Sequence, residues 1–141
     1  IPIYGDGTNI RDWLYVIDHA KAADQVFHNG KNYETYNIGG FSECKNIDLV
    51  KLICKKMDEK LEKNIGNSEK LIKFIKDRPG HDYRYAIDAT RINKDLGWSV
   101  SVTLEDGISK TINWYIENKK WLENIFNGDY RSYNLKKYSK Q

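Results

Sequence analysis

The chain has 141 residues, of which 40% are hydrophobic and 30% are charged, a size and balance that fit one domain with a modest core. No apolar run approaches the ~20 residues of a membrane-spanning helix and no signal-peptide pattern is found, so we expect a cytoplasmic protein with no membrane partner. The net charge of +3 comes mostly from lysines on predicted helix faces rather than from a basic stripe interleaved with aromatic residues, which argues against nucleic-acid binding.

The first elements are strands separated by a turn. Residues 1–4 form the end of a strand, and residues 5–9 have turn chemistry. The two glycines of this turn do not form a dinucleotide-binding fingerprint, because no third glycine follows at the required spacing and no helix opens there. Alternating apolar residues then predict a strand over residues 10–16.

Two helices with a strand between them are predicted next. The first helix runs from Asp18 to about His28, is ended by Asn29-Gly30, and precedes a β-favouring run at residues 33–38. The second is amphipathic, runs to about Leu61, and has Asn46 as its candidate N-cap. The apolar residues expected to face the core from the first helix are Ala22, Ala23 and Val26.

The two cysteines, Cys44 and Cys54, lie outside any C-x-x-C motif and have no histidine cluster to join. This pattern predicts reduced thiols, with Cys54 on the core face of its helix. It also predicts that the chain has no metal site.

The second half of the chain begins with a polar loop at residues 64–70 and a short strand at residues 71–75. A helix over residues 89–96 is predicted after Asp88 as its cap, and Gly97 ends it. A final helix, capped by Thr103, is expected to extend to about Phe126, with Tyr115 on its apolar face.

Between the strand at 71–75 and the helix at 89–96 lies a loop, residues 77–88, that concentrates guanidinium, imidazole and phenol groups. Pro79-Gly80 breaks regular structure there and allows a sharp turn. Such groups suit an anion that is attached to a flat ring. The alternative interpretation is a turn whose charges only face water, because most loops bind nothing.

Several blocks of the sequence resemble the nucleotide-sugar 4,6-dehydratases, the dTDP-glucose 4,6-dehydratase family of extended short-chain dehydrogenases. They are Pro-Ile-Tyr-Gly-Asp-Gly-Thr-Asn-Ile-Arg-Asp-Trp-Leu-Tyr-Val at 2–16, Tyr-Asn-Ile-Gly-Gly at 36–40 followed by Asn46, Asp-Arg-Pro-Gly-His-Asp-Tyr-Arg-Tyr-Ala-Ile-Asp at 77–88, and Leu-Gly-Trp at 96–98 with Trp-Tyr at 114–115. They occur in family order and cover nearly all of the chain.

The resemblance implies an α/β (α+β) fold, namely the small mixed C-terminal substrate-binding domain of such an enzyme. We expect short strands and three to four helices, with the N-terminal Rossmann part missing. Residues 1–141 would form this single domain, with a disordered tail at 127–141. NAD would be bound by the missing part and not by this fragment, and the full-length enzyme would be a homodimer.

The family reaction is an NAD-dependent hydro-lyase step that converts dTDP-glucose to dTDP-4-keto-6-deoxyglucose and water, on the route to deoxysugars such as rhamnose. The resemblance assigns this fragment to holding the nucleoside diphosphate, with no catalytic residue of its own. Arg11 would hold the diphosphate, Tyr4 with Pro2 would pack beside the base, and Arg78 would lie near ribose or phosphate. Further contacts to the nucleotide portion would come from Asn46, His81 and Tyr138. A structural hydrogen bond within its own loop is the alternative role of His81.

Two segments match the superfamily's catalytic Tyr-x-x-x-Lys pattern, Tyr115 to Lys119 and Tyr133 to Lys137. We interpret neither as an active site. Both follow the substrate-loop blocks, whereas the family's pair precedes them, and no glycine-rich βαβ unit comes before either one. Tyr115 is instead predicted to lie in the core.

Three alternatives stay open. The chain could belong to a UDP-glucose 4,6-dehydratase, because one thymine methyl group is worth only ~1 kcal/mol of apolar burial. It could belong to another extended short-chain enzyme, such as a UDP-sugar epimerase or decarboxylase. It could also be a stand-alone binding module without catalysis.

Overall fold

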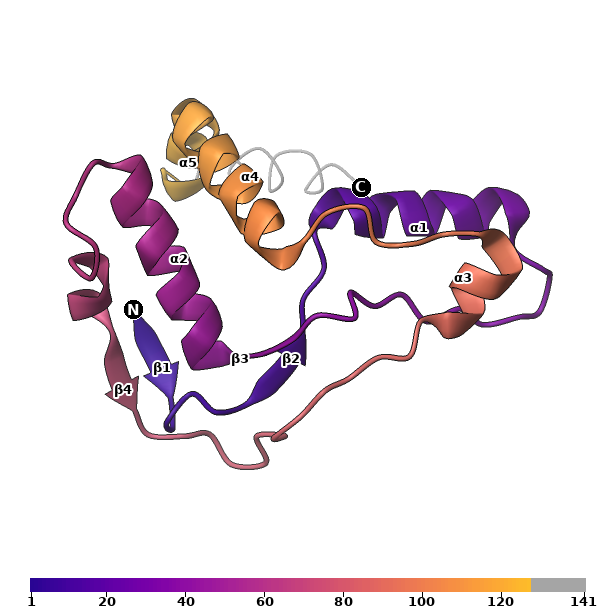
Figure 1. Cartoon of the computed structure of the whole chain (residues 1–141), viewed down its shortest axis with the longest axis horizontal. Helices are drawn as coiled ribbons and strands as arrows, with labels where there is room; N and C mark the ends of the chain where they lie inside the picture. Colours follow the sequence, from indigo (N-terminus) through magenta and orange to yellow (C-terminus); the bar gives the residue numbers. More distant parts are fainter. Residues whose placement is uncertain (128–141) are drawn as a thin grey trace, which may run out of the picture. The chain divides into compact units, whose positions relative to one another are not determined.

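The computed structural model describes residues 1–127, which contain short strands and helices (Figure 1). The predicted tail at 127–141 and Tyr138 therefore lie outside the described residues from position 128 onward. The elements, in order, are β1 (Pro2–Tyr4), β2 (Ile10–Asp12), α1 (Val16–Asn29), β3 (Glu43–Lys45), α2 (Asn46–Lys60), the 3-10 helix η1 (Ser68–Leu71), β4 (Lys73–Ile75), α3 (Thr90–Leu96), α4 (Leu104–Glu117) and α5 (Lys119–Phe126). The predicted mixed α/β class is confirmed, with five α-helices among these residues rather than three to four.

The chain divides into two compact units, residues 1–108 and residues 109 onward. In the first unit, β1 pairs with β4 in parallel, Pro2 opposite Lys73 and Tyr4 opposite Ile75. A second small sheet pairs β2 antiparallel to β3, with Arg11 opposite Cys44. Figure 1 shows β3 leading directly into α2.

The core of the first unit forms where α1 meets α3. Ala22, Ala89 and Ile92 are fully buried there together with Trp98, which is 7% exposed. The indole Nε1 of Trp98 donates a hydrogen bond of 3.1 Å to the backbone oxygen of Asp18. The predicted end of α3 at Gly97 is confirmed, and this residue has φ +69° with its amide donating to the backbone oxygen of Asn93.

The predicted strand at residues 10–16 is wrong in its second half. β2 stops at Asp12, and α1 begins at Val16, two residues before Asp18. The carboxylate of Asp12 accepts hydrogen bonds from the amides of Gly40 (2.6 Å) and Ser42 (2.7 Å), so it binds the chain that enters β3. The ladder therefore ends at the pair of Asp12 with Glu43, the first residue of β3.

The predicted strand at residues 33–38 is wrong as well. Within residues 1–127, this run has no strand beside it to accept its backbone groups, and it follows an irregular path. Its apolar side chains are used in packing instead, because Tyr36 and Ile38 lie against the core. Ala23 is exposed, one position off the face of α1 that buries Ala22.

Asn46 is not the N-cap of α2. It is the first helical residue, and its amide donates a 2.9 Å hydrogen bond to the backbone oxygen of Asn9. Thr103, in contrast, caps α4 as predicted, since its Oγ1 accepts from the Asp106 amide at 3.2 Å.

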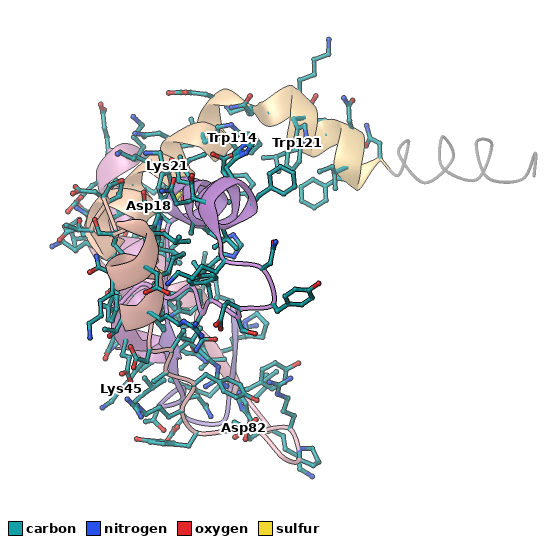
Figure 2. All side chains as sticks on the ribbon, turned by 90° about the vertical axis from the view of Figure 1, so that its right-hand side faces the viewer. Asp18, Lys21, Lys45, Asp82, Trp114 and Trp121 are labelled. Carbon is teal, nitrogen blue, oxygen red and sulfur yellow. The ribbon has the colours of Figure 1, made fainter. Side chains whose placement is uncertain are left out.

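The last helical segment is interrupted rather than continuous. Asn118, with φ −107° and ψ 41°, separates α4 from α5, and its side chain donates to the Trp114 oxygen at 2.8 Å. Trp114 and Trp121 meet edge to face with centroids 5.0 Å apart (Figure 2). Tyr115 is 45% exposed, so the prediction that it is a core residue is wrong.

Candidate functional site

The loop at residues 77–88 is attached to β2 by main-chain hydrogen bonds. The amide of Ile10 donates to the Tyr83 oxygen at 2.7 Å, and the amide of Tyr85 donates back to the Ile10 oxygen at 3.0 Å. A parallel bridge thus forms between Ile10 and Arg84. The Arg84 guanidinium also binds the Glu43 carboxylate through Nε at 2.5 Å and Nη2 at 2.6 Å. The second half of the loop is therefore fixed to both strands of this sheet.

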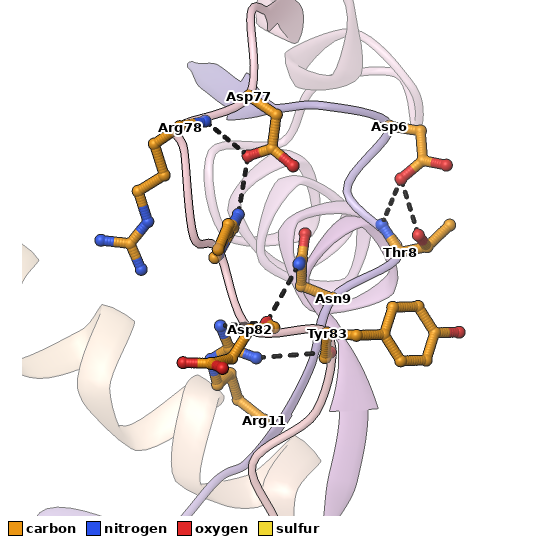
Figure 3. A network of polar contacts seen from close by, with 9 residues as sticks. Asp6, Thr8, Asn9, Arg11, Asp77, Arg78, Asp82 and Tyr83 are labelled. Carbon is orange, nitrogen blue, oxygen red and sulfur yellow. Dashed lines mark hydrogen bonds and ion pairs between the residues drawn. The ribbon is translucent and has the colours of Figure 1, made fainter.

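Arg11, on β2, turns its guanidinium toward this loop (Figure 3). Its Nη1 donates to the Ile10 oxygen at 2.6 Å, and its Nη2 donates to the Asp82 oxygen at 3.0 Å. A third contact, from Nη1 to the Tyr83 oxygen, is long at 3.5 Å. The ring of Tyr85 lies below the guanidinium, 4.6 Å from its Cζ. The group is thus held in its plane by carbonyls and on one face by a ring.

Two of the five N–H groups of Arg11 remain for a ligand. A guanidinium has one proton on Nε and two on each Nη, and the carbonyls take both of those on Nη1 and one on Nη2. None of the contacts among the described residues uses Nε. Nε and Nη2 are the pair with which Arg84 grips Glu43, so Arg11 presents a pair of nitrogens that suits a carboxylate or phosphate.

The first half of the loop is organised by Asp77. Its Oδ1 lies 2.7 Å from Nδ1 of His81 and accepts the Arg78 amide at 2.8 Å. The hydrogen bond from His81, with that of the Arg78 amide, holds the pKa of the Asp77 carboxyl below its ordinary value. The His81 side chain is only 6% exposed and meets Tyr4 edge to face at 6.3 Å. The hydrogen bond within its own loop, which is the alternative role of His81, is therefore present.

The other predicted site residues differ in how they are connected to the loop at 77–88. The Arg78 side chain is exposed and extends away from Asp77 (Figure 3). Tyr4 and Pro2 are exposed on β1, and Tyr4 reaches the loop through its contact with His81. Asn46 is linked to the loop through Asn9, whose oxygen accepts the Asn46 amide and whose side chain donates to the Asp82 oxygen.

Asn9 and Tyr85 were not among the predicted site residues, although the phenol of Tyr85 belongs to the loop expected to bind an anion. Asn9 is 6% exposed and its Nδ2 donates to the Asp82 oxygen at 3.2 Å, so it joins the turn after β1 to the loop. The Tyr85 hydroxyl donates to Oδ2 of Asp82. The signal was their place within the two blocks at 2–16 and 77–88, although nothing in the pattern paired the blocks.

These residues do not form a nucleotide-cofactor fold or a metal site. Gly5 and Gly7 lie between two strands, and no helix opens after them to hold a pyrophosphate. Among residues 1–127, no group of three or more His, Cys, Asp or Glu side chains could hold a metal ion, and both cysteines are free. No helix in this part of the chain is long and apolar enough to cross a membrane.

Comparison with known proteins places this arrangement in a family. The sequence model described as GDP-mannose 4,6 dehydratase matches residues 1–111. The chain belongs to the GDP-mannose 4,6-dehydratase family. The matched range includes β1, Arg11 and the whole loop at 77–88, so the cluster just described lies within the matched residues.

Particular members of the family are closely similar. A dTDP-glucose 4,6-dehydratase of Escherichia coli is 53% identical over 133 residues, which are 92% of this chain and 37% of that protein. The crystal structure of a dTDP-glucose 4,6-dehydratase from Bacillus anthracis in complex with NAD superposes with a TM-score of 0.70 at 41% identity, covering 85% of this chain and 35% of that one. The Streptomyces venezuelae dTDP-glucose 4,6-dehydratase DesIV, with NAD and TYD bound, gives 0.73 at 34% identity, covering 86% and 35%. The chain thus spans little more than a third of these relatives.

Proposed function

We propose that residues 1–141 are the substrate-binding domain of an NAD-dependent dTDP-glucose 4,6-dehydratase and that they hold the nucleoside diphosphate of the sugar nucleotide. The observation that carries this proposal is the Arg11 guanidinium, which carbonyls and the Tyr85 ring hold with Nε and one Nη2 proton left over. The 53% identity to a relative of that activity supports the substrate class.

In this proposal Arg11 receives the diphosphate, Arg78 reaches the ribose or phosphate from the outer side of the loop, and Tyr4 with Pro2 packs beside the base. Asn46, His81 and Tyr138 complete the nucleotide contacts. Holding the diphosphate fixes the hexose relative to the reacting groups, and such positioning is worth several kcal/mol of barrier in favourable systems. The residues of this chain bind and orient, and they transfer no proton or hydride.

The chemistry would come from elsewhere in the protein. NAD, together with the catalytic tyrosine, lysine and carboxylates, is assigned to a Rossmann part that these residues do not include. The full-length enzyme would be a cytoplasmic homodimer. The exposed apolar side chains of the first unit, such as Phe27, Phe41 and Phe74 at 83%, 62% and 60%, are suited to contact with that part.

Calorimetric titration tests the proposal. dTDP, UDP and their glucose conjugates are titrated into the full-length protein and into residues 1–141 alone. We expect the full-length protein to bind the nucleoside diphosphates and to convert the glucose conjugate, and residues 1–141 to bind weakly and to convert nothing. Tighter binding of UDP would favour a UDP-glucose dehydratase. Absence of nucleotide binding by the full-length protein would contradict the proposal.

A further inference from the structure

We propose that Tyr85 is a positioning residue that holds the Arg11 guanidinium in the orientation that receives the diphosphate, an inference that rests on the proposed function of Arg11. The two side chains come from different parts of the first unit, β2 and the loop at 77–88. The Cζ of Arg11 lies 4.6 Å from the centroid of the Tyr85 ring, within the range of an attractive contact between a cation and an aromatic face.

Tyr85 is itself fixed at both ends. Its amide donates to the Ile10 oxygen at 3.0 Å, and its hydroxyl donates to Oδ2 of Asp82. The Asp82 backbone oxygen accepts Nη2 of Arg11. Arg11, Asp82 and Tyr85 therefore form a closed set of contacts, in which the residue that anchors the ring also anchors the cation.

The Asp82 carboxylate also affects the hydroxyl of Tyr85 that donates this hydrogen bond. The bond to Asp82, with the negative charge of that carboxylate, holds the pKa of the Tyr85 hydroxyl above its ordinary value. A phenol is neutral at pH 7 with or without this shift, so the ring adds no negative charge beside the cation, and the negative charge of this set of contacts is on the Asp82 carboxylate.

The carbonyls alone do not define where Nε points. They hold Nη1 and Nη2 in the plane of the guanidinium and make no contact with Nε, and an arginine has considerable rotamer freedom to lose on binding. The Tyr85 ring adds a contact on one face of the guanidinium before the ligand arrives. Tyr85 thus acts on affinity through Arg11 and does not contact the phosphate itself.

A double-mutant cycle in the full-length protein tests this coupling, with the dissociation constant of dTDP measured by calorimetry for Tyr85→Leu, Arg11→Ala and both together. Tyr85→Leu should weaken dTDP binding by about 3- to 30-fold, the range expected for loss of a cation–aromatic contact. In the Arg11→Ala background the same change should have no further effect. Tyr85→Phe, which retains the ring, should bind more like the wild type than like Tyr85→Leu.

The matched control is Tyr33→Leu, which removes a fully exposed ring of the first unit that lies outside the loop at 77–88. The dissociation constant of dTDP for this variant should equal that for the wild type. A second measurement needs no ligand: the Nε–H proton resonance of Arg11 should carry a ring-current shift that Tyr85→Leu abolishes and Tyr85→Phe retains.

The possible outcomes distinguish the positioning role of Tyr85 from the proposed function of Arg11. If Arg11→Ala weakens dTDP binding and Tyr85→Leu weakens it equally with and without Arg11, Tyr85 acts independently and this inference is overturned while the proposed function stands. The inference is likewise overturned if Tyr85→Leu changes neither the affinity nor the Arg11 resonance. If Arg11→Ala itself leaves the affinity unchanged, the proposed role of Arg11 fails and the inference fails with it.

Discussion

The carboxylate of Asp18, in the first turn of α1, accepts a hydrogen bond of 2.5 Å from the hydroxyl of Ser101, which lies 83 positions later in the chain. The amides of Ser101 and Val102 donate to the same carboxylate at 2.9 and 3.0 Å. Asp18 is 1% exposed, so these bonds replace its hydration. Burial alone would raise the pKa of Asp18, but the three hydrogen bonds and the nearby Lys21 outweigh it, and the pKa lies below its ordinary value (Figure 2).

Asp18→Asn should lower the free energy of unfolding at neutral pH by about 2–3 kcal/mol, because a charged acceptor of three hydrogen bonds is lost from a buried site. The folded-state pKa lies below the unfolded value near 3.8, so the contribution is present above that value and disappears as the pH falls through the folded-state pKa. Urea unfolding of both proteins across this range should show the difference shrinking in acid. Asp24→Asn, on the same helix and 73% exposed, is the control and should stay within about 0.5 kcal/mol. Equal effects at the two positions would contradict this account.

Arg11→Ala in the full-length protein should weaken binding of the nucleoside diphosphate by roughly 1.5–3 kcal/mol, the scale of a charge-assisted hydrogen bond. Arg11→Lys should recover little of this, because an ammonium keeps the charge but lacks the pair of fixed N–H groups. Calorimetric titration measures the affinity of both variants for the nucleoside diphosphate. An unchanged affinity in Arg11→Ala would remove Arg11 from the site.

Arg78→Ala provides the contrast with Arg11. Both arginines are proposed ligands of the nucleotide, but only Arg11 holds the Ile10 and Asp82 carbonyls together. Arg78→Ala should therefore weaken binding while its unfolding free energy stays within about 0.5 kcal/mol of the wild type. Arg11→Ala should lower both the affinity for the nucleotide and the free energy of unfolding.

Gly40→Ala should destabilise the protein by about 1–3 kcal/mol or more, because its new Cβ would lie 2.1 Å from the backbone oxygen of Trp13. Backbone atoms cannot shift to relieve this clash as readily as the end of a flexible side chain could. Gly97→Ala is the comparison, since nothing lies within 4 Å of a Cβ there and only its φ of +69° is unfavourable. That variant should cost about 1 kcal/mol. Denaturant unfolding ranks the two, and a larger loss at Gly97 would be inconsistent with the packing described here.

Tyr115→Phe should leave turnover of the full-length enzyme near that of the wild type. Tyr115 lies on α4, whereas Lys119 begins α5 beyond the break at Asn118, so the two do not occupy adjacent turns of one helix as a catalytic Tyr-x-x-x-Lys pair requires. Steady-state kinetics measures this. Loss of turnover without loss of folding would assign catalysis to Tyr115 after all.

The helices were largely predictable because their signals are local. Apolar spacing predicted the end of α2 to within one residue. Gly97 marks the end of α3 and Thr103 the start of α4, and both signals depend only on backbone conformation and nearby amides. The strands were less predictable, since a strand exists only where another lies beside it. The run at 33–38 has strand composition but no neighbouring strand among residues 1–127.

The candidate site was predicted as a set of residues but not as a geometry. The blocks at 2–16 and 77–88 identified Tyr4, Arg11 and the loop. Nothing in the spacing indicated that carbonyls of the loop would hold Arg11, because the contact joins residues 71 positions apart. The exposure of Tyr115 was also missed, since periodic spacing shows which residues share a face but not whether that face is covered.

The parallel pairing of β1 with β4 bears on when the loop at 77–88 becomes ordered. Each strand has three residues, and together they join positions as distant as Pro2 and Lys73, so this pairing should form late in folding, after α1 and α2. So short a ladder also opens without global unfolding. The amides of Gly5 and Lys73, which donate at 3.0 Å across the pair, should therefore exchange with solvent deuterium sooner than those of the α2 interior, and a bound nucleotide should slow them.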